Sequence, residues 1–155
     1  MLSSFTRRNL KDASLLGAPL FMGPELDDAW STRLADLRRA VERLSLLGAQ
    51  DALVLLRASF SAPRVQHLMR CSPSVDHPAL SEFDRILRSA ICKITNCDLS
   101  ENQWLQAGLP IRDGGLGIRR VSSLALPAFL ASAAGSLSLQ DAILAQADTK
   151  PDSYF

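Results

Sequence analysis

The stretch LSEFDRILRSAICKI, from Leu80 to Ile94, decides the fold class. Its large apolar side chains recur at spacings of three and four residues, which is the period of one face of an α-helix. These side chains are Leu80, Phe83, Leu87, Ile91 and Ile94, and the charged side chains Glu82, Arg85, Arg88 and Lys93 lie off the stripe. The pattern predicts an amphipathic helix that packs in the core of a helical protein.

Upstream of this stretch, the helical period continues. From Glu25 onward one face carries Trp30, Leu34, Leu37, Val41 and Leu44, with Gly48 as a stop signal. Residues 51–60 are nearly all apolar, which predicts a helix that is buried on most sides at the centre of the core. Pro63 is tolerated in a first turn and can open a short helix that runs to Cys71.

Downstream, Ser100 and Gln103 have the spacing of a capping box, which predicts a short helix that carries Trp104. The Ala- and Leu-rich residues 121–134 predict a helix that Pro127 should bend or split. A second helix is expected over residues 137–147, begun by Gly135 and Ser136.

At the N-terminal side, the apolar run from Leu15 to Leu20 contains Gly17 and Pro19, as expected of a strand or a hairpin arm. The expected fold is an all-α, single-domain multi-helix bundle with a short N-terminal β-hairpin or strand. We expect an N-terminal extension over residues 1–24, a helical domain over 25–147 and a flexible tail over 148–155.

Length and composition agree with one folded unit. The chain has 155 residues, 47% hydrophobic and 21% charged, which is typical of a single globular domain. It has no run of about 18 consecutive apolar residues and no apolar segment behind the first charges, so we expect no membrane span and no secretion signal. Three cysteines suit free thiols, which indicates an intracellular protein, nuclear or cytoplasmic.

The positive charge is concentrated in the middle of the chain. Residues 33–120 contain 13 Lys or Arg against 9 Asp or Glu, giving +4, whereas the net charge of the whole chain is +1. A uniformly basic nucleic-acid binder is therefore not indicated. Arg57, Arg64, Arg70, Arg85 and Arg88 could form a face that contacts phosphates. The alternative is a solvated face with salt bridges to Asp51, Glu82 and Asp84, and the spacing alone favours this alternative.

Three further groups were considered as sites of chemistry. Asp27 and Asp28 resemble the paired carboxylates of a metal site, but they open a helix, where negative charge is favoured by the helix dipole. His67, Cys71, Cys92 and Cys97 are potential zinc ligands without the tight pairs of a structural zinc site. The Gly114–Gly117 segment lacks the Gly-Lys-Ser/Thr ending of a P-loop and predicts a turn. The sequence therefore predicts no catalytic residues, no metal site and no cofactor.

One pattern resembles a known family. The segment Leu15–Leu20, followed much later by LPIRDGGLGI from Leu109 to Ile118, resembles the region after the palm in reverse transcriptases of non-LTR retrotransposons. Positions between the two blocks fit as well, namely Pro63, Arg64, His67, Arg70, Cys71, Trp104, Gln106 and Ala107. The resemblance covers residues 13–147.

The resemblance implies a role for these segments. Leu16 and Gly17 would correspond to the primer grip, and the helices beyond them would correspond to the thumb, which clamps an RNA or RNA–DNA template–primer duplex through its phosphates. The five arginines named above are then the candidate phosphate ligands, and the missing palm domain is a candidate partner. The sequence lacks an aromatic-x-Asp-Asp hairpin, so no nucleotide transfer is expected.

A second hypothesis belongs to another functional class. The chain could be a stand-alone helical protein-interaction module, in which Trp30, Trp104 or Phe129 inserts into a groove of a partner.

Overall fold

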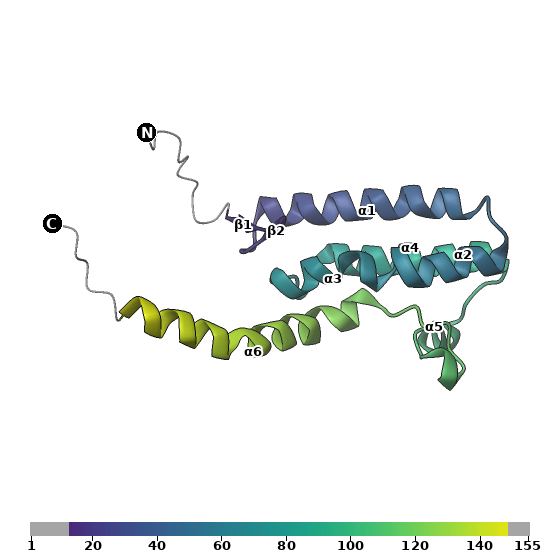
Figure 1. Cartoon of the computed structure of the whole chain (residues 1–155). Helices are drawn as coiled ribbons and strands as arrows, with labels where there is room; N and C mark the ends of the chain where they lie inside the picture. Colours follow the sequence, from purple (N-terminus) through teal and green to yellow (C-terminus); the bar gives the residue numbers. More distant parts are fainter. Residues whose placement is uncertain (1–12, 149–155) are drawn as a thin grey trace.

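The computed structural model describes residues 13–148, apart from the side chains of Leu15 and residues 146–148. Within this range the protein is an all-α bundle with one small hairpin (Figure 1). The hairpin pairs β1 (Ser14–Leu15) with β2 (Ala18–Pro19). The helical elements are α1 (Pro24–Leu44), α2 (Ala49–Leu55), the π-helical turn η2 (Leu56–Phe60), α3 (Ala62–Cys71), α4 (Pro78–Thr95), α5 (Glu101–Ala107), the 3₁₀ turn η3 (Ile111–Asp113) and α6 (Val121–Asp148).

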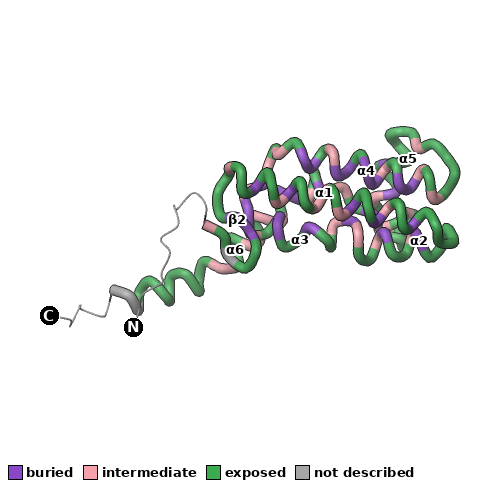
Figure 2. Tube along the Cα trace, turned by 90° about the horizontal axis from the view of Figure 1, so that it is seen from above, coloured by how far each residue is buried: buried purple, intermediate pink, exposed green. Residues whose placement is uncertain are grey.

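Helix α4 is the centre of the bundle, as its sequence predicts. It contacts α1, α2 and α6, and its apolar stripe is buried, with Phe83, Leu87 and Ile91 fully enclosed. Each such side chain stabilises the fold by about 1.5 to 3 kcal/mol relative to exposure in water. Figure 2 shows the buried residues gathered along the facing sides of α1, α3 and α4. The predicted all-α class and the N-terminal hairpin are both confirmed.

The hairpin is tied into this core. Ala18 is fully buried, and the Ser72 hydroxyl donates a hydrogen bond to the Pro19 carbonyl at 2.5 Å. The turn between the strands consists of Leu16 and Gly17, both with positive φ, 51° and 79°. Gly adopts this conformation without steric cost, which is why a Gly at this position permits a two-residue hairpin turn.

The apolar run at residues 51–60 does not form the centre of the core, so this prediction is wrong. Only Ala52 and Leu56 are buried, whereas Val54 is 53% exposed and Leu55 39% exposed. Four consecutive apolar residues on a helix point to all sides, and α2 lies at the edge of the bundle, where only one side finds a partner. The segment also changes its winding, because the Ser61 amide donates to the Leu56 carbonyl at 2.8 Å in the i to i+5 pattern of a π-turn.

The tail helices predicted at residues 121–134 and 137–147 are one continuous helix, α6. Pro127 lies inside it and does not split it (Figure 1). Ala and Leu on both sides are strong helix formers. Ser136 does not begin a new helix, because its hydroxyl donates to the Ala133 carbonyl at 2.9 Å within the same helix. The flexible tail predicted at residues 148–155 lies, except for the backbone of Asp148, outside the described residues.

Candidate nucleic-acid interface

The arginines fall into two groups, according to whether a carboxylate neutralises them. Arg64 lies 3.0 Å from Asp36, Arg85 makes two 2.7 Å bonds to Glu82, and Arg88 pairs with Glu101. Three of the five arginines predicted as phosphate ligands are therefore held in ion pairs on the protein's own surface. Among the carboxylates predicted to form salt bridges with these arginines, Glu82 pairs with Arg85 as expected. Asp84 instead accepts a hydrogen bond from the backbone at the start of α6.

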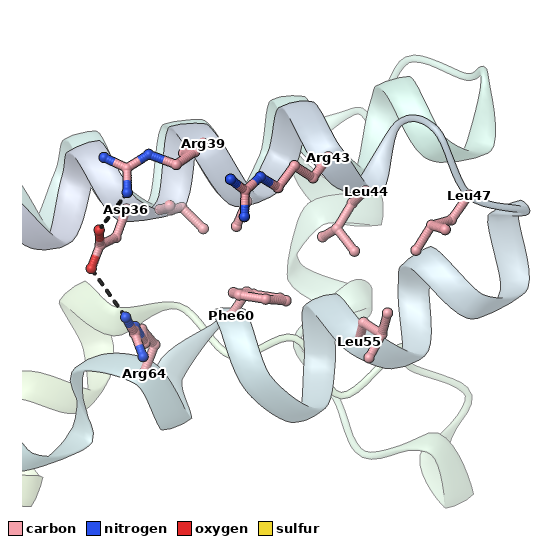
Figure 3. Close-up of a pocket in the computed structure, with 10 residues that line it drawn as sticks. Asp36, Arg39, Arg43, Leu44, Leu47, Leu55, Phe60 and Arg64 are labelled. Carbon is pink, nitrogen blue, oxygen red and sulfur yellow. Dashed lines mark hydrogen bonds and ion pairs between the residues drawn. The ribbon is translucent and has the colours of Figure 1, made fainter.

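Figure 3 shows the environment of Arg64. It lines a cleft of about 390 Å³ between α1 and the α2–η2 segment. Asp36 bridges Arg64 and Arg39 at one end, and Leu44, Leu47, Leu55 and Phe60 form the other end. The charge of Arg64 is thus directed toward α1.

The pair between Arg85 and Glu82 shifts the pKa of both partners. The two hydrogen bonds from Arg85, together with the neighbouring Arg38, lower the pKa of Glu82 from its ordinary 4.5 to about 2. Glu82 in turn raises the pKa of Arg85. The carboxylate of Glu82 therefore offsets the charge that Arg85 could offer to a phosphate.

A second group of cations forms no ion pair within residues 13–148. Arg57 and Arg119 line a cleft of about 290 Å³ between α3 and α6. A neighbouring cleft of about 460 Å³, lined by His67 and Arg70, shares Pro63 and Gln66 with it. We call the two clefts together the α3–α6 groove. Its lining consists of Arg57, Ser61, Ala62, Pro63, Gln66, His67, Met69, Arg70, Cys71, Gly117, Arg119, Leu124, Ala128 and Ser132.

The α3–α6 groove has no carboxylate among its lining residues. Three guanidinium groups without acidic partners create a positive potential along α3, with Gln66 between them as a further hydrogen-bond donor. An arginine fork binds phosphate oxygens through two parallel hydrogen bonds. The groove can therefore hold anionic oxygens of a backbone that runs along α3.

The glycine-rich block of the sequence builds one wall of this groove. After η3, Gly114 takes a left-handed conformation with φ 80°, and the amide of Gly117 donates to the Leu109 carbonyl at 2.9 Å. A Cβ on Gly117 would lie 3.0 Å from Cδ of Arg57, so the absence of a side chain lets the Arg57 stem lie against the loop. The block thus forms the predicted turn and also positions a cation.

The hairpin tip adjoins the groove through His67. The Nε2 atom of His67 lies 3.2 Å from the carbonyl oxygen of Leu16, and Nδ1 lies 3.6 Å from Sγ of Cys71. Leu16 is 86% exposed, so the tip presents an apolar side chain and the backbone of Gly17 to the outside. Of the predicted site residues, Arg57 and Arg70 line the groove, and the hairpin tip of Leu16 and Gly17 adjoins it through His67. The structure does not bring Arg85 and Arg88, which lie on α4, to this groove.

Arg119 was not among the residues predicted from the sequence. It follows the glycine-rich block directly and precedes α6, whose first 20 residues carry no charge. The sequence signal that could have found it is the pair Arg119 and Arg120, which stands between a glycine-rich loop and an uncharged helix. That Arg119 lines the same cleft as Arg57 depends on how the loop folds, which the spacing of residues in the sequence does not reveal.

The other side chains considered for chemistry have structural roles. Nδ1 of His77 accepts a hydrogen bond from the Ala79 amide at the start of α4. This leaves Nε2 of His77 as the donor to the carboxylate of Asp27, at 2.9 Å. In the part of the chain that the structure describes, no group of three or more His, Cys, Asp or Glu side chains is placed to hold a metal ion.

Trp30 and Trp104 are not available to a partner, so this part of the interaction hypothesis is wrong. Trp30 is fully enclosed and donates from Nε1 to the Ser74 hydroxyl at 3.1 Å, and Trp104 is 4% exposed. Both side chains face the bundle, where their large apolar area is best buried. Phe129 is half-buried on α6.

No family model, no curated protein and no solved structure matches this chain.

Proposed function

We propose that the chain is a non-catalytic, thumb-like helical domain that holds an RNA or RNA–DNA template–primer duplex through its phosphates. The observation that supports this proposal is the carboxylate-free α3–α6 groove, with Arg57, Arg70 and Arg119 along it. The exposed hairpin tip at Leu16 and Gly17 adjoins the groove, as a primer-grip-like element would.

The size of the groove suits a nucleic-acid backbone. Helix α3 has 10 residues and is roughly 15 Å long at 1.5 Å per residue. This length spans more than one phosphate of a nucleic-acid strand. Three arginines and one glutamine can contact such phosphates without reading any base, so the expected binding is independent of sequence.

The proposal is tested by fluorescence anisotropy with a labelled RNA–DNA hybrid over a range of salt concentrations. Three phosphate contacts should give a slope of log K against log salt of roughly −2 to −3. Replacing Arg57→Glu and Arg119→Glu together should reduce the magnitude of this slope by about 2. The double replacement should also weaken binding at least about a hundredfold, since each of the two charged hydrogen bonds contributes about 1.5 to 3 kcal/mol.

The matched control is the pair Arg85→Glu and Arg88→Glu, which makes the same change in net charge on α4. Because both arginines are held by carboxylates, we expect a smaller loss of affinity than in the groove variant. An equal loss in both variants would show that only total charge matters. Binding that is absent, or that does not change with salt, would contradict the proposal.

Polymerase activity is not part of this proposal, because the sequence carries no aromatic-x-Asp-Asp motif. In a reverse transcriptase the metal-binding carboxylates belong to the palm, so a palm domain is a proposed partner. An intracellular location, nuclear or cytoplasmic, follows from the proposed ligand.

A further inference from the structure

Helix α6 has one face inside the bundle and a long part outside it. Val121 and Ala125 are buried against the core, and Ala128 is half-buried. Beyond these residues the helix extends away from the body of the bundle, and its residues are exposed (Figures 1 and 2). Among the described helices, α6 alone is long and apolar enough to cross a membrane, judged by length and composition only.

The side of α6 that faces away from the core carries a stripe of leucines. Leu126, Leu130, Leu137 and Leu144 are 47%, 54%, 56% and 62% exposed. At 3.6 residues per turn these four side chains lie within about 40° of one line along the helix. The last three recur every seven residues, which fills one of the two apolar positions in the repeat by which helices pack along each other. The stripe therefore fits a helical partner.

The charge pattern of α6 indicates what kind of helix that partner is. No charged side chain occurs from Val121 to Gln140, and Asp141 is the only one between Val121 and Ala147. Such a face gives neither an acidic nor a basic partner an electrostatic advantage. An equally uncharged leucine face is complementary to it, and α6 itself has that composition.

The spacing is also symmetric about Leu137. If two α6 helices pair antiparallel with their Leu137 side chains facing each other, Leu130 of one copy lies opposite Leu144 of the other. In the same register Asp141 lies opposite Ala133 of the second copy. A parallel pair would bring the two Asp141 carboxylates to the same level, where like charges repel. The antiparallel arrangement is therefore favoured.

We propose that the leucine stripe of α6 is a self-association surface, through which two copies of the chain pair antiparallel around Leu137. The contact from Leu130 to Leu144 is roughly 21 Å long. Three leucines per copy are far fewer than the roughly 20 to 30 residues a side of a standard interface. Association is therefore expected to depend on protein concentration. This surface is separate from the α3–α6 groove and does not depend on nucleic-acid binding.

The proposal is tested by sedimentation velocity of the full chain over a hundredfold range of concentration. The wild type should shift from monomer to dimer, with no larger species. Leu137→Asp places two like charges together at the centre of the contact and should abolish the shift. Wild-type protein that stays monomeric at every concentration would overturn the proposal.

A matched control lies two residues away. Leu139 is 63% exposed, so Leu139→Asp makes the same chemical change at about 200° around the helix. This variant should dimerise like the wild type, and circular dichroism should show equal helix content in both variants. Equal loss of dimer in the two variants would indicate unspecific apolar association and would overturn the proposal.

The orientation has its own test. Ala133→Lys should place an ammonium group opposite Asp141 of the second copy and tighten the dimer severalfold at low salt, with the gain lost at high salt. No gain would rule out the antiparallel register. Binding of a monomeric wild type to neutral phosphatidylcholine vesicles, lost equally in Leu137→Asp and Leu139→Asp, would overturn self-association in favour of a membrane contact.

Discussion

Gly115 lies where the loop after α5 folds back on itself. A Cβ at this position would stand 2.0 Å from the carbonyl oxygen of Leu109 and 2.6 Å from that of Gln106, both parts of the backbone. Backbone atoms cannot move aside as a flexible side chain can. This position therefore requires glycine because of space, whereas Gly114 and Gly117 favour it because of their positive φ.

We expect Gly115→Ala to lower the free energy of unfolding by about 2 to 3 kcal/mol, in the range of other overpacked sites. Urea denaturation followed by circular dichroism measures this change. The control is Gly135→Ala in α6, where nothing lies within 4 Å of the added methyl group. Alanine favours the helix by about 0.5 to 1 kcal/mol there. If Gly115→Ala were as well tolerated as this control, the close packing of the loop would be wrong.

The ion pair of Glu82 predicts a particular dependence of stability on pH. Its pKa is lowered from 4.5 to about 2 in the folded protein, chiefly by Arg85. The ionised form therefore stabilises the fold above pH 4.5, and this contribution is lost as the pH falls from 4.5 toward 2.

Unfolding of wild type and Glu82→Gln should accordingly differ at pH 7 and converge toward pH 2. The measurement is thermal unfolding of the two proteins at matched pH values, since all other carboxylates titrate equally in both. A difference that stays constant between pH 7 and pH 2 would contradict the role assigned to the pair.

At the scale of the elements, a single carboxylate anchors the start of α6. Asp84 of α4 is 7% exposed, and it accepts hydrogen bonds from the amides of Val121 at 2.7 Å and Ser122 at 3.1 Å. The hydroxyl of Ser122 donates to the same carboxylate. The first amides of a helix lack partners within the helix, and the helix dipole favours negative charge at this end.

We expect Asp84→Ala to lower the free energy of unfolding by about 2 to 3 kcal/mol, because it removes a helix cap and leaves buried amides without partners. Hydrogen exchange should show the largest loss of protection at the start of α6. Asp28→Ala, which removes an exposed carboxylate near the start of α1, is the control and should have a small effect. A similar cost for both variants would mean that Asp84 does not anchor α6.

Individual elements show how far the sequence determines the fold. The stripe on α4 and the capping box at Ser100 were predicted correctly, because both depend on residues within one turn or a few turns of helix. The burial of residues 51–60 was predicted wrongly, because the neighbouring elements decide which sides of a helix are covered. The continuity of α6 from residues 121–134 into residues 137–147 was missed for a related reason, since the start signal at Gly135 and Ser136 competes with helix formers on both sides.

At the scale of the whole molecule, the candidate site could be predicted only in part. The sequence indicated a strand or hairpin arm over Leu15–Leu20, in which Leu16 and Gly17 were singled out by the resemblance, and a set of arginines. Whether an arginine is free or neutralised depends on carboxylates far away in the chain, such as Asp36, which is 28 residues from Arg64. Pairings over that distance follow from the packing of helices and not from spacing.

The two tryptophans can show whether the bundle unfolds as one unit. Trp30 on α1 stacks on His77 and meets Phe83 edge-on, and Trp104 lies on α5. We expect the single-tryptophan variants Trp30→Phe and Trp104→Phe each to show a fluorescence transition that coincides with the loss of helix content in the same variant. A fluorescence transition of the Trp30→Phe variant at lower urea than its helix loss would show that α5 and its loop unfold separately.

The π-turn at Leu56–Phe60 has a consequence for how the chain tolerates changes in length. The wider turn holds one more residue than an α-helical turn would, and two residues within it, Arg57 and Phe60, line the α3–α6 groove and the cleft between α1 and the α2–η2 segment. Such a turn absorbs its extra residue locally, so deleting Ala58 would leave a turn of ordinary α-helical width with the chain after it kept in phase. In a regular helix the same deletion would rotate everything after it by about 100°. This segment is therefore expected to tolerate the loss of one residue better than the regular helices around it.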